Sequence, residues 1–382
     1  MVEWKKLVAV SDVLYGYPFE SSQFSEDSTY MPLIRIRDVK PAKASTYYSG
    51  EFNEAYRIKK GDILVGMDGE FNLGKWDDRD GLLNQRVLKL KGKDGYSIDG
   101  YLFHYMGPVF KKIEKETAGG SVKHLSAKVI NSILIPIPSL EEQTRIVGIL
   151  DTFTSAIDNL KEQIAQRRKQ YEYYRDQLLD LEGKEIITTL SFGDDFQLKA
   201  RIGWQGLTKK EYKTSGDYKL VTGTDFTGNL RIDFESCVFV EKERYEQDEY
   251  IKLKVGDVLI TKDGTLGKVA YIDKLDMPAT LNGGIFVVRD PKKRVIPKFI
   301  MYYLTSYHFK KWMQQNHTTG SIQHLTQKLL STFTIPVLSE IEQQRIVSIL
   351  DTFESSIQNL EAQLKQREKQ YEYYRNKLLS FE

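Results

Sequence analysis

The sequence contains a single cysteine, Cys237, and no run of apolar residues long enough to cross a membrane. One cysteine excludes an internal disulfide and favours a reducing compartment. The first residues, MVEWKKLVAVSDVLYG, lack the apolar stretch of a secretory signal. We therefore expect a cytoplasmic protein with no membrane attachment.

The net charge is also small: the sequence contains 55 Lys and Arg and 53 Asp and Glu, which give a formal net charge of +2. No strong overall field attracts nucleic acid, so any DNA binding must rest on local patches. The five histidines and the one cysteine show no metal-ligand spacing. A glycine-rich cofactor fingerprint and the Asn/Asp-Pro-Pro-aromatic motif of an amino methyltransferase are missing too. We predict no catalysis, cofactor or metal in this chain.

One segment, Gly69–Trp76, imitates a phosphate-binding P-loop. Trp76 stands where Ser or Thr would hold magnesium, and no convincing helix follows. The related loop Gly264–Lys268 has lost the spacing. His124 and His324 recur in register without a partner motif for nucleophilic catalysis. We interpret them as structural or binding residues.

A repeat of 42 residues decides the organisation of the chain. Residues 141–182 and 341–382 are identical at 27 positions, at a spacing of 200 residues. The sequence ahead of each copy matches its counterpart far less well. The chain therefore carries two near-identical segments and two divergent domains. We divide it into 1–138, 139–183, 184–338 and 339–382.

Each copy of the repeat reads as a long helix. Apolar residues alternate at spacings of four and three from Ile146 to Leu181, with Arg167 included, and from Ile346 to Phe381 in the second copy. This is the a/d seam of a coiled coil. Ser139…Glu142 and Ser339…Glu342 predict a capping box at each helix start. Arg167 and Arg367 on the seam either fix the register or pack their stems while the charged heads reach water.

Polar positions off the seam recur as well, and we interpret them as residues that packing does not demand. Two copies of one surface for two copies of one partner would explain this. The residues predicted to bind that partner are Gln143, Arg145, Asp151, Tyr173, Arg175, Gln343, Arg345, Asp351, Tyr373 and Arg375.

A weaker repeat relates the two globular domains. The β-branched runs DILVG and DVLIT predict strands, and residues 101–116 and 297–316 predict one helix in each domain. Residues 122–130 and 322–330 predict a short helix after a Gly-Ser turn. Each domain is thus of mixed α/β class, with a twisted sheet and a few helices.

Loops rich in Gly, Lys, Arg and amide side chains suit DNA backbone contacts and base-edge reading, and the Gly-Ser turns offer donors at a helix start. Ordinary solvated turns have the same composition, so this interpretation stays open at this point.

The order of these segments resembles the specificity subunit of type I restriction-modification systems, over essentially the whole chain. The resemblance rests on Gly-Asp-Ile-Leu and Gly-Asp-Val-Leu, on Gly-Ser-x-x-His-Leu, and on Ile-Pro-x-x-Ser-x-x-Glu-Gln-x-Arg-Ile ahead of each long helix. ARIGWQGLTKKEY in the second domain is similar to the family too. The first domain has no close match to IGWQGL, which leaves its N-terminal region, including Trp4 and residues 15–19, unplaced.

This resemblance implies two target-recognition domains with twisted sheets, each reading one half of an asymmetric bipartite site in double-stranded DNA. It implies that the two long helices form an antiparallel coiled coil with a pseudo-two-fold internal repeat. The coiled coil would set the spacing and dock two modification subunits, and restriction subunits would join the full complex. S-adenosylmethionine, ATP and Mg would belong to those partners.

Carried over by motif, the residues expected near DNA lie in the loops and turns of both domains. They are Lys75, Trp76, Arg79, Gln85, Arg86, Ser121, Lys123 and His124 in the first, and Lys262, Thr265, Lys268, Asn282, Ser321, Gln323 and His324 in the second. The alternative hypothesis is a non-catalytic coiled-coil adaptor whose two domains bind protein or glycan ligands.

Overall fold

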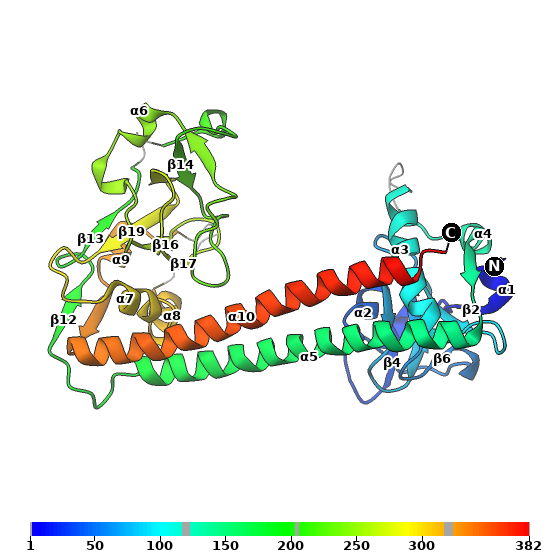
Figure 1. Cartoon of the computed structure of the whole chain (residues 1–382). Helices are drawn as coiled ribbons and strands as arrows, with labels where there is room; N and C mark the ends of the chain where they lie inside the picture. The colour runs from blue at the N-terminus through cyan, green and yellow to red at the C-terminus, as the bar shows by residue number, and fades with distance from the viewer. Residues whose placement is uncertain (1, 117–122, 203–205, 317–323, 382) are drawn as a thin grey trace. The chain divides into compact units, whose positions relative to one another are not determined.

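The computed structural model describes residues 2–116, 123–202, 206–316 and 324–381 (Figure 1). The chain forms two compact units. One comprises Met1–Asn159 with Leu364–Glu382, and the other comprises Leu160–Gln363. Each unit therefore contains one globular domain and parts of both long helices. Among the described residues, none of the helices combines the length and the apolar character needed to span a bilayer.

The first globular domain is built from three small sheets. One is four-stranded and antiparallel, one is five-stranded, and one is a two-stranded ribbon beside the start of the long helix. In sheet order the strands are β2 (Ser11–Tyr15), β10 (Val87–Gly92), β7 (Ile63–Gly66) and β8 (Leu73–Lys75); β3 (Phe24–Ser25), β5 (Tyr47–Tyr48), β4 (Met31–Ile34), β9 (Gly81–Leu83) and β6 (Arg57–Ile58); and β1 (Glu3–Lys6) with β11 (Leu134–Ile137).

The second domain repeats this plan with a smaller middle sheet. In sheet order its strands are β13 (Gln197–Lys199), β19 (Ile285–Arg289), β16 (Val258–Thr261) and β17 (Val269–Tyr271); β15 (Val238–Val240), β14 (Tyr218–Val221) and β18 (Ala279–Leu281); and β12 (Thr188–Ser191) with β20 (Thr334–Val337). The mixed α/β class and the internal repeat predicted from the sequence are confirmed.

Helices cover the sheets of both domains. The first domain has α1 (Leu7–Val10), α2 (Ile36–Val39), α3 (Asp99–Glu116) and α4 (Ala127–Ser132). The second has α6 (Lys242–Tyr245), α7 (Pro297–Tyr303), α8 (Tyr307–Gln315) and α9 (Gln327–Leu330). The largest core cluster of each domain contains strand residues of its four-stranded sheet, packed on α3 in the first domain and on α7 in the second.

The recurring Gly-Asp dipeptide closes the same turn in both domains. Gly61 and Gly256 have φ of 92° and 94°, a left-handed conformation that glycine adopts without steric cost. The aspartate side chain that follows closes the turn. The Asp62 carboxylate accepts a hydrogen bond from the backbone N–H of Lys59 at 2.7 Å, and Asp257 makes the equivalent bond. The turn leads directly into β7 and β16, which are fully buried.

Two helix predictions need correction. Residues 297–316 form α7 and α8 rather than one helix, because the Thr305 and Ser306 hydroxyls bond the carbonyls of Tyr302 and Tyr303 and interrupt the ladder. The short helices start later than expected: Ser126 and Thr326 cap α4 and α9 with their side chains.

The long helices are α5 (Leu140–Leu179) and α10 (Glu340–Leu378), green and orange to red in Figure 1. Within each unit they run antiparallel. Phe153 stacks on Tyr374 at 5.2 Å between ring centroids in one unit, and Tyr174 stacks on Phe353 at 5.5 Å in the other. The seam predicted from the sequence is confirmed.

Details at the helix starts and on the seam refine the predictions. Ser139 and Ser339 accept the capping hydrogen bonds from the N–H groups of Glu142 and Glu342. The Glu142 and Glu342 carboxylates do not close the capping box; each pairs with an arginine three residues on. On the seam, the Arg367 guanidinium lies 5.8 Å from the Phe153 ring centroid, which favours a packed stem with an exposed head.

Candidate DNA-reading surface and helix docking sites

A buried glutamine joins α5 to the first domain. The Gln143 Oε1 accepts a hydrogen bond from the backbone N–H of Ile98 at 3.1 Å. Its Nε2 donates to the carbonyls of Tyr96 and Pro138 at 2.8 and 3.0 Å. Because Gln143 is 0 % exposed, these bonds satisfy a side chain that could not otherwise be buried without cost. Gln143 is therefore a docking residue of its own domain.

The second copy of the helix makes the same contacts with the second domain. The Gln343 Oε1 accepts from the backbone N–H of Ile296 at 2.8 Å, and its Nε2 donates to the carbonyls of Leu338 and Arg294 at 2.9 and 3.2 Å. Gln343 is buried as well. A polar residue that recurs in this way fixes the angle at which each domain meets its helix.

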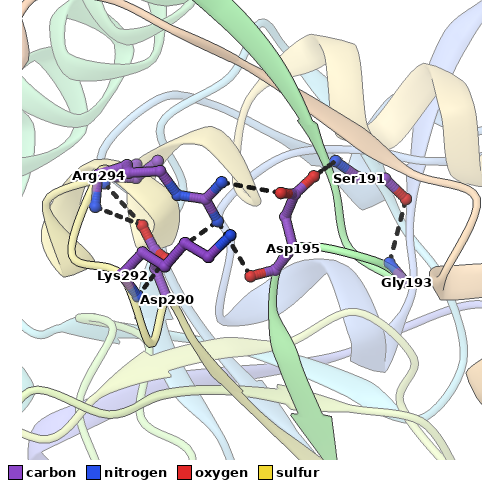
Figure 2. A network of polar contacts seen from close by, with 7 residues as sticks. Ser191, Gly193, Asp195, Asp290, Lys292 and Arg294 are labelled. Carbon is purple, nitrogen blue, oxygen red and sulfur yellow. Dashed lines mark hydrogen bonds and ion pairs between the residues drawn. The ribbon is translucent and has the colours of Figure 1, made fainter.

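A network around Arg294 stiffens the segment that Gln343 binds. Figure 2 shows the Arg294 guanidinium between Asp195 and Asp290. Its Nη1 donates to the Asp195 Oδ1 at 2.8 Å. Asp195 also accepts from the backbone N–H of Ser191. These bonds connect the β12–β13 turn to the end of β19, so the carbonyl that Gln343 recognises is held in place.

Asp151 is the second docking residue of α5. It accepts a hydrogen bond from the His104 Nε2 at 2.7 Å, and the His104 Nδ1 lies 3.0 Å from the Tyr371 hydroxyl. The side chain of His104 is fully buried, and this burial lowers the pKa of the imidazole despite the neighbouring carboxylate. The Lys75 ammonium also reaches toward Asp151, at 3.9 Å.

In the second unit, Asp351 accepts from the Tyr302 hydroxyl at 2.7 Å and from the Lys298 ammonium at 2.6 Å. Burial, together with Asp351, raises the pKa of Tyr302 far above its usual range. Tyr302 occupies the place that His104 occupies in the first unit. The two domains thus use different residues against an identical carboxylate.

The premise that packing does not demand the recurring polar residues is therefore wrong for six of the ten predicted partner-binding positions. Four of them dock the domains, as described above. The remaining two lie over a tyrosine of their own helix. The six are Gln143, Asp151, Gln343, Asp351, and Arg175 and Arg375, whose guanidinium carbons lie 5.6 and 5.5 Å from the Tyr171 and Tyr371 ring centroids.

The other four predicted partner-binding residues are exposed. Tyr173 and Tyr373 are 59 % and 61 % exposed. Arg145 and Arg345 form matching ion pairs with the glutamates three residues before them. Exposed arginine and tyrosine side chains therefore recur at matching positions in both copies of the helix.

The first loop region predicted to contact DNA is not one surface. Trp76 is 1 % exposed, and its indole N–H donates to the Arg79 carbonyl, so the prediction that it lies at a DNA surface is wrong. The Arg79 guanidinium donates to the carbonyls of Ser28 and Tyr30. Lys75 lies over the Phe103 ring. Gly74 and Lys75 belong to β8, so a strand stands where a P-loop needs a helix N-terminus.

A second group of predicted residues does converge. The His124 Nδ1 lies 2.5 Å from the Asp68 Oδ1, and the Arg86 Nε lies 3.4 Å from the Asp68 Oδ2. Gln85 is exposed beside them, and the backbone of Lys123 bonds that of the loop after β7. The sequence shows both partners in matching register, Asp68-Gly69 with Asp263-Gly264 and His124 with His324, but it gives no signal that they pair.

The second domain repeats the Asp–His pair: the His324 Nδ1 lies 2.5 Å from the Asp263 Oδ1. Asp263 borders a concavity of about 570 Å³ that contains three of the predicted residues, Thr265, Lys268 and Asn282. Sequence reasoning missed other residues that line it. These include Lys209, Tyr212, Thr222 and Thr224. The Tyr212 hydroxyl accepts a hydrogen bond from the Asn282 amide at 2.9 Å.

Some predicted positions remain outside these groups. Lys262 lies with its ammonium 5.1 Å from the Phe286 ring centroid. Ser121, Ser321 and Gln323 lie outside the described residues. Across the part of the chain that the structure describes, no group of His, Cys, Asp and Glu could hold a metal ion.

The strand register places the first-domain segment that had no match in the sequence. Tyr15 pairs with Leu88 at the end of β2, and Lys199 pairs with Val287 at the end of β13. The residues after Tyr15 therefore leave the sheet at the place where residues 201 and 202 leave it in the second domain. Tyr17 is exposed there, next to the turn that contains Gln85.

Comparison with known proteins gives a consistent result. A family model described as "Type I restriction modification DNA specificity domain" matches residues 1–167 and 204–368. The chain is 26 % identical over 380 residues to the type I restriction enzyme EcoBI specificity subunit of Escherichia coli, covering 93 % of this chain and 80 % of that protein. It is 28 % identical over 353 residues to the EcoR124I/EcoR124II specificity subunit of the same species, covering 87 % and 84 %.

The fold is similar to solved structures of such proteins. A type I restriction-modification S subunit from M. genitalium matches with a TM-score of 0.62 at 16 % identity, over 100 % of this chain and 97 % of that one. A chain from a study of complex assembly and conformational transition of the type I R-M system matches with a TM-score of 0.56 at 18 % identity, over 99 % and 96 %. The chain belongs to the family of type I restriction-modification DNA specificity subunits, which are not themselves catalysts.

Proposed function

We propose that this chain selects the DNA target of a type I restriction-modification complex, each globular domain reading one half of an asymmetric bipartite site. One observation supports this most: the two units share their docking residues and their Asp–His pair but differ in the residues around that pair. Two domains that read different half-sites need the same backbone structure and different side chains on the DNA-facing surface. The family membership does not favour the adaptor alternative.

The DNA-facing surface of each domain lies around its Asp–His pair. In the first domain this surface comprises Gln85, Arg86, Lys123 and His124. In the second it comprises Thr265, Lys268, Asn282 and His324, with Tyr212 orienting the Asn282 amide. Amide and guanidinium groups read base edges in the major groove, and lysines contact phosphates.

The exposed residues that recur on the two long helices contact two modification subunits. These exposed residues are Arg145, Tyr173, Arg345 and Tyr373. Exposed tyrosines offer contact area at little cost in side-chain entropy. Helical segments 139–183 and 339–382 separate the domains 1–138 and 184–338 and so set the spacer. The modification and restriction subunits bind S-adenosylmethionine, ATP and Mg. The complex binds chromosomal DNA in the cytoplasm.

The test is to co-express this chain with its modification subunit and to map N6-methyladenine across the genome of the host. We expect one asymmetric split motif that is lost when the chain is omitted. A stable complex of the two proteins without any new motif would contradict DNA selection and would favour the adaptor hypothesis.

Docking is tested separately by replacing Tyr173 and Tyr373 together with alanine. Copurification of the modification subunit should be lost, and the fold should be retained because both side chains are exposed. Tyr250→Ala is the matched control, because Tyr250 is similarly exposed but lies in the second globular domain. Unchanged copurification of the double variant would contradict this docking surface.

A further inference from the structure

The turn between β9 and β10 presents Arg86 from a rigid base. The backbone N–H of Gln85 donates to the Tyr17 carbonyl at 2.8 Å, and the Arg86 carbonyl accepts from the Met67 N–H at 2.8 Å. Arg86 has a φ of 71°, a left-handed conformation that is sterically unfavourable for a residue with a side chain. Strain of this kind persists where the surrounding structure fixes it, and it concentrates at functional sites.

The guanidinium of Arg86 forms an ion pair with Asp68 and lies beside His124. Its Nε lies 3.4 Å from the Asp68 Oδ2, and its Nη1 lies 3.5 Å from the His124 Nδ1. The other Asp68 oxygen lies 2.5 Å from the His124 Nδ1, so the carboxylate is shared between the two side chains. The Arg86 side chain is still 54 % exposed, which leaves guanidinium N–H groups available to a ligand.

We propose that Arg86 reads a guanine in the half-site of the first domain, and that Asp68 is the residue that positions it; this rests on the proposed function. Two guanidinium N–H groups match the O6 and N7 acceptors of guanine in the major groove. A fixed orientation serves base reading, which is directional. A phosphate contact gains little from it and would be weakened by repulsion between the phosphate and the Asp68 carboxylate.

The second domain has the same backbone contacts and the same Asp–His pair, but no residue equivalent to Arg86. Asp263 and His324 pair as Asp68 and His124 do, and the Lys262 N–H donates to the Gly284 carbonyl at 2.8 Å, as Met67 does to Arg86. Gly284 therefore stands at the position of Arg86. The space around Gly284 would admit a side chain, because an added Cβ atom would meet nothing closer than the Asp263 side chain at 3.6 Å. The guanine requirement set by this position should thus exist in one half-site and not in the other.

The first experiment maps N6-methyladenine for the full complex with wild-type chain, Arg86→Ala, Arg86→Lys and Asp68→Asn. We expect Arg86→Ala to relax one G·C position in one half-site to any base, a loss of about 5- to 150-fold in discrimination. Arg86→Lys should retain part of the preference, and Asp68→Asn should weaken it while guanine stays favoured. The other half-site should be unchanged in every variant, which also reports that the chain folds and assembles.

Lys91→Ala is the matched control for charge, because Lys91 is an exposed cation on β10 of the same domain. It should leave the motif unchanged. An Arg86→Ala motif identical to that of the wild type would overturn the inference. So would a uniform loss of affinity for all sequences with a salt slope lower by about one, which indicates a phosphate contact.

A second measurement changes the DNA and not only the protein. The wild-type complex is titrated with duplexes in which each guanine of the half-sites is replaced in turn by 7-deazaguanine, which lacks the N7 acceptor. One replacement in one half-site should weaken binding, and the Arg86→Ala complex should not distinguish that duplex from the natural one. No effect at any guanine of either half-site would refute the inference, whereas a wild-type chain that yields no split motif would instead refute the proposed function.

Discussion

The Gln343 carboxamide oxygen accepts a hydrogen bond from the Ile296 N–H at 2.8 Å, and this contact ties α10 to the residue before α7. Replacing Gln343 with alanine leaves that N–H and two carbonyls without their partner. We expect the free energy of unfolding to fall by about 1–3 kcal/mol, measured by urea denaturation. Gln344→Ala, one residue on and exposed, is the control and should change stability by less than about 0.5 kcal/mol. Equal effects of the two substitutions would contradict a docking role for Gln343.

The buried His104 should make the free energy of unfolding depend on pH, and Tyr302 at the equivalent position of the second unit should not. The folded-state pKa of His104 is lower than the ordinary value of 6.5, first because of burial. The unfolded chain therefore binds more protons near that pH. The stability contributed by neutral His104 is present above about pH 6.5 and is lost as the pH falls through the folded-state pKa, with a slope of at most about 1.4 kcal/mol per pH unit.

His104→Tyr, which installs the residue found at Tyr302, should flatten this slope. Urea denaturation of both proteins between about pH 5.5 and pH 7.5 gives the comparison. Parallel pH profiles for the wild type and His104→Tyr would show that another group causes the dependence.

Two tryptophans of the first domain should respond very differently to truncation. Trp76 is 1 % exposed, so Trp76→Ala should cost about 3–5 kcal/mol of stability through lost burial and the cavity that remains. Trp4 is 50 % exposed, and Trp4→Ala should cost far less. Thermal or urea unfolding of both variants checks this. If Trp76→Ala proved as stable as Trp4→Ala while losing DNA binding, Trp76 would be a contact residue after all.

Lys268 tests the DNA surface of the second domain. It lines the concavity beside Asp263, and a phosphate contact there releases about one counterion. Lys268→Ala should weaken binding evenly across sequences and lower the magnitude of the salt slope by about one. Fluorescence anisotropy on a labelled duplex at several salt concentrations measures both. Lys210→Ala, an exposed lysine that does not line the concavity, is the control.

The seam and the long helices could be predicted because their signal is periodic. The apolar spacing from Ile146 onward repeats often enough to be read from one sequence, and α5 begins within two residues of the predicted Ser139 boundary. The break between α7 and α8 could not be read in this way. It depends on the Thr305 and Ser306 hydroxyls choosing backbone carbonyls, a local competition that apolar periodicity does not report.

The candidate site was predicted less well, because the role of each residue depends on contacts with residues that are far away in the sequence. Gln143 looks like a surface residue until its three hydrogen bonds to the first domain are seen. Trp76 has the composition of a binding loop, but it is a core residue. Asp68-Gly69 and Asp263-Gly264 recur in the sequence as His124 and His324 do. The pairing of each aspartate with a histidine could not be predicted, since 56 and 61 residues separate the partners.

The composition of the first unit bears on how the chain matures during synthesis. His104 meets the Tyr371 hydroxyl, which lies 267 residues later in the chain. The N-terminal domain thus emerges from the ribosome long before the segment Leu364–Glu382 that completes its unit. Closing so long a loop is slow, so the buried surface around His104 stays open at least until residues 364–382 have been synthesised. We expect this interval to be the stage at which a nascent chain is most exposed to chaperones and proteases.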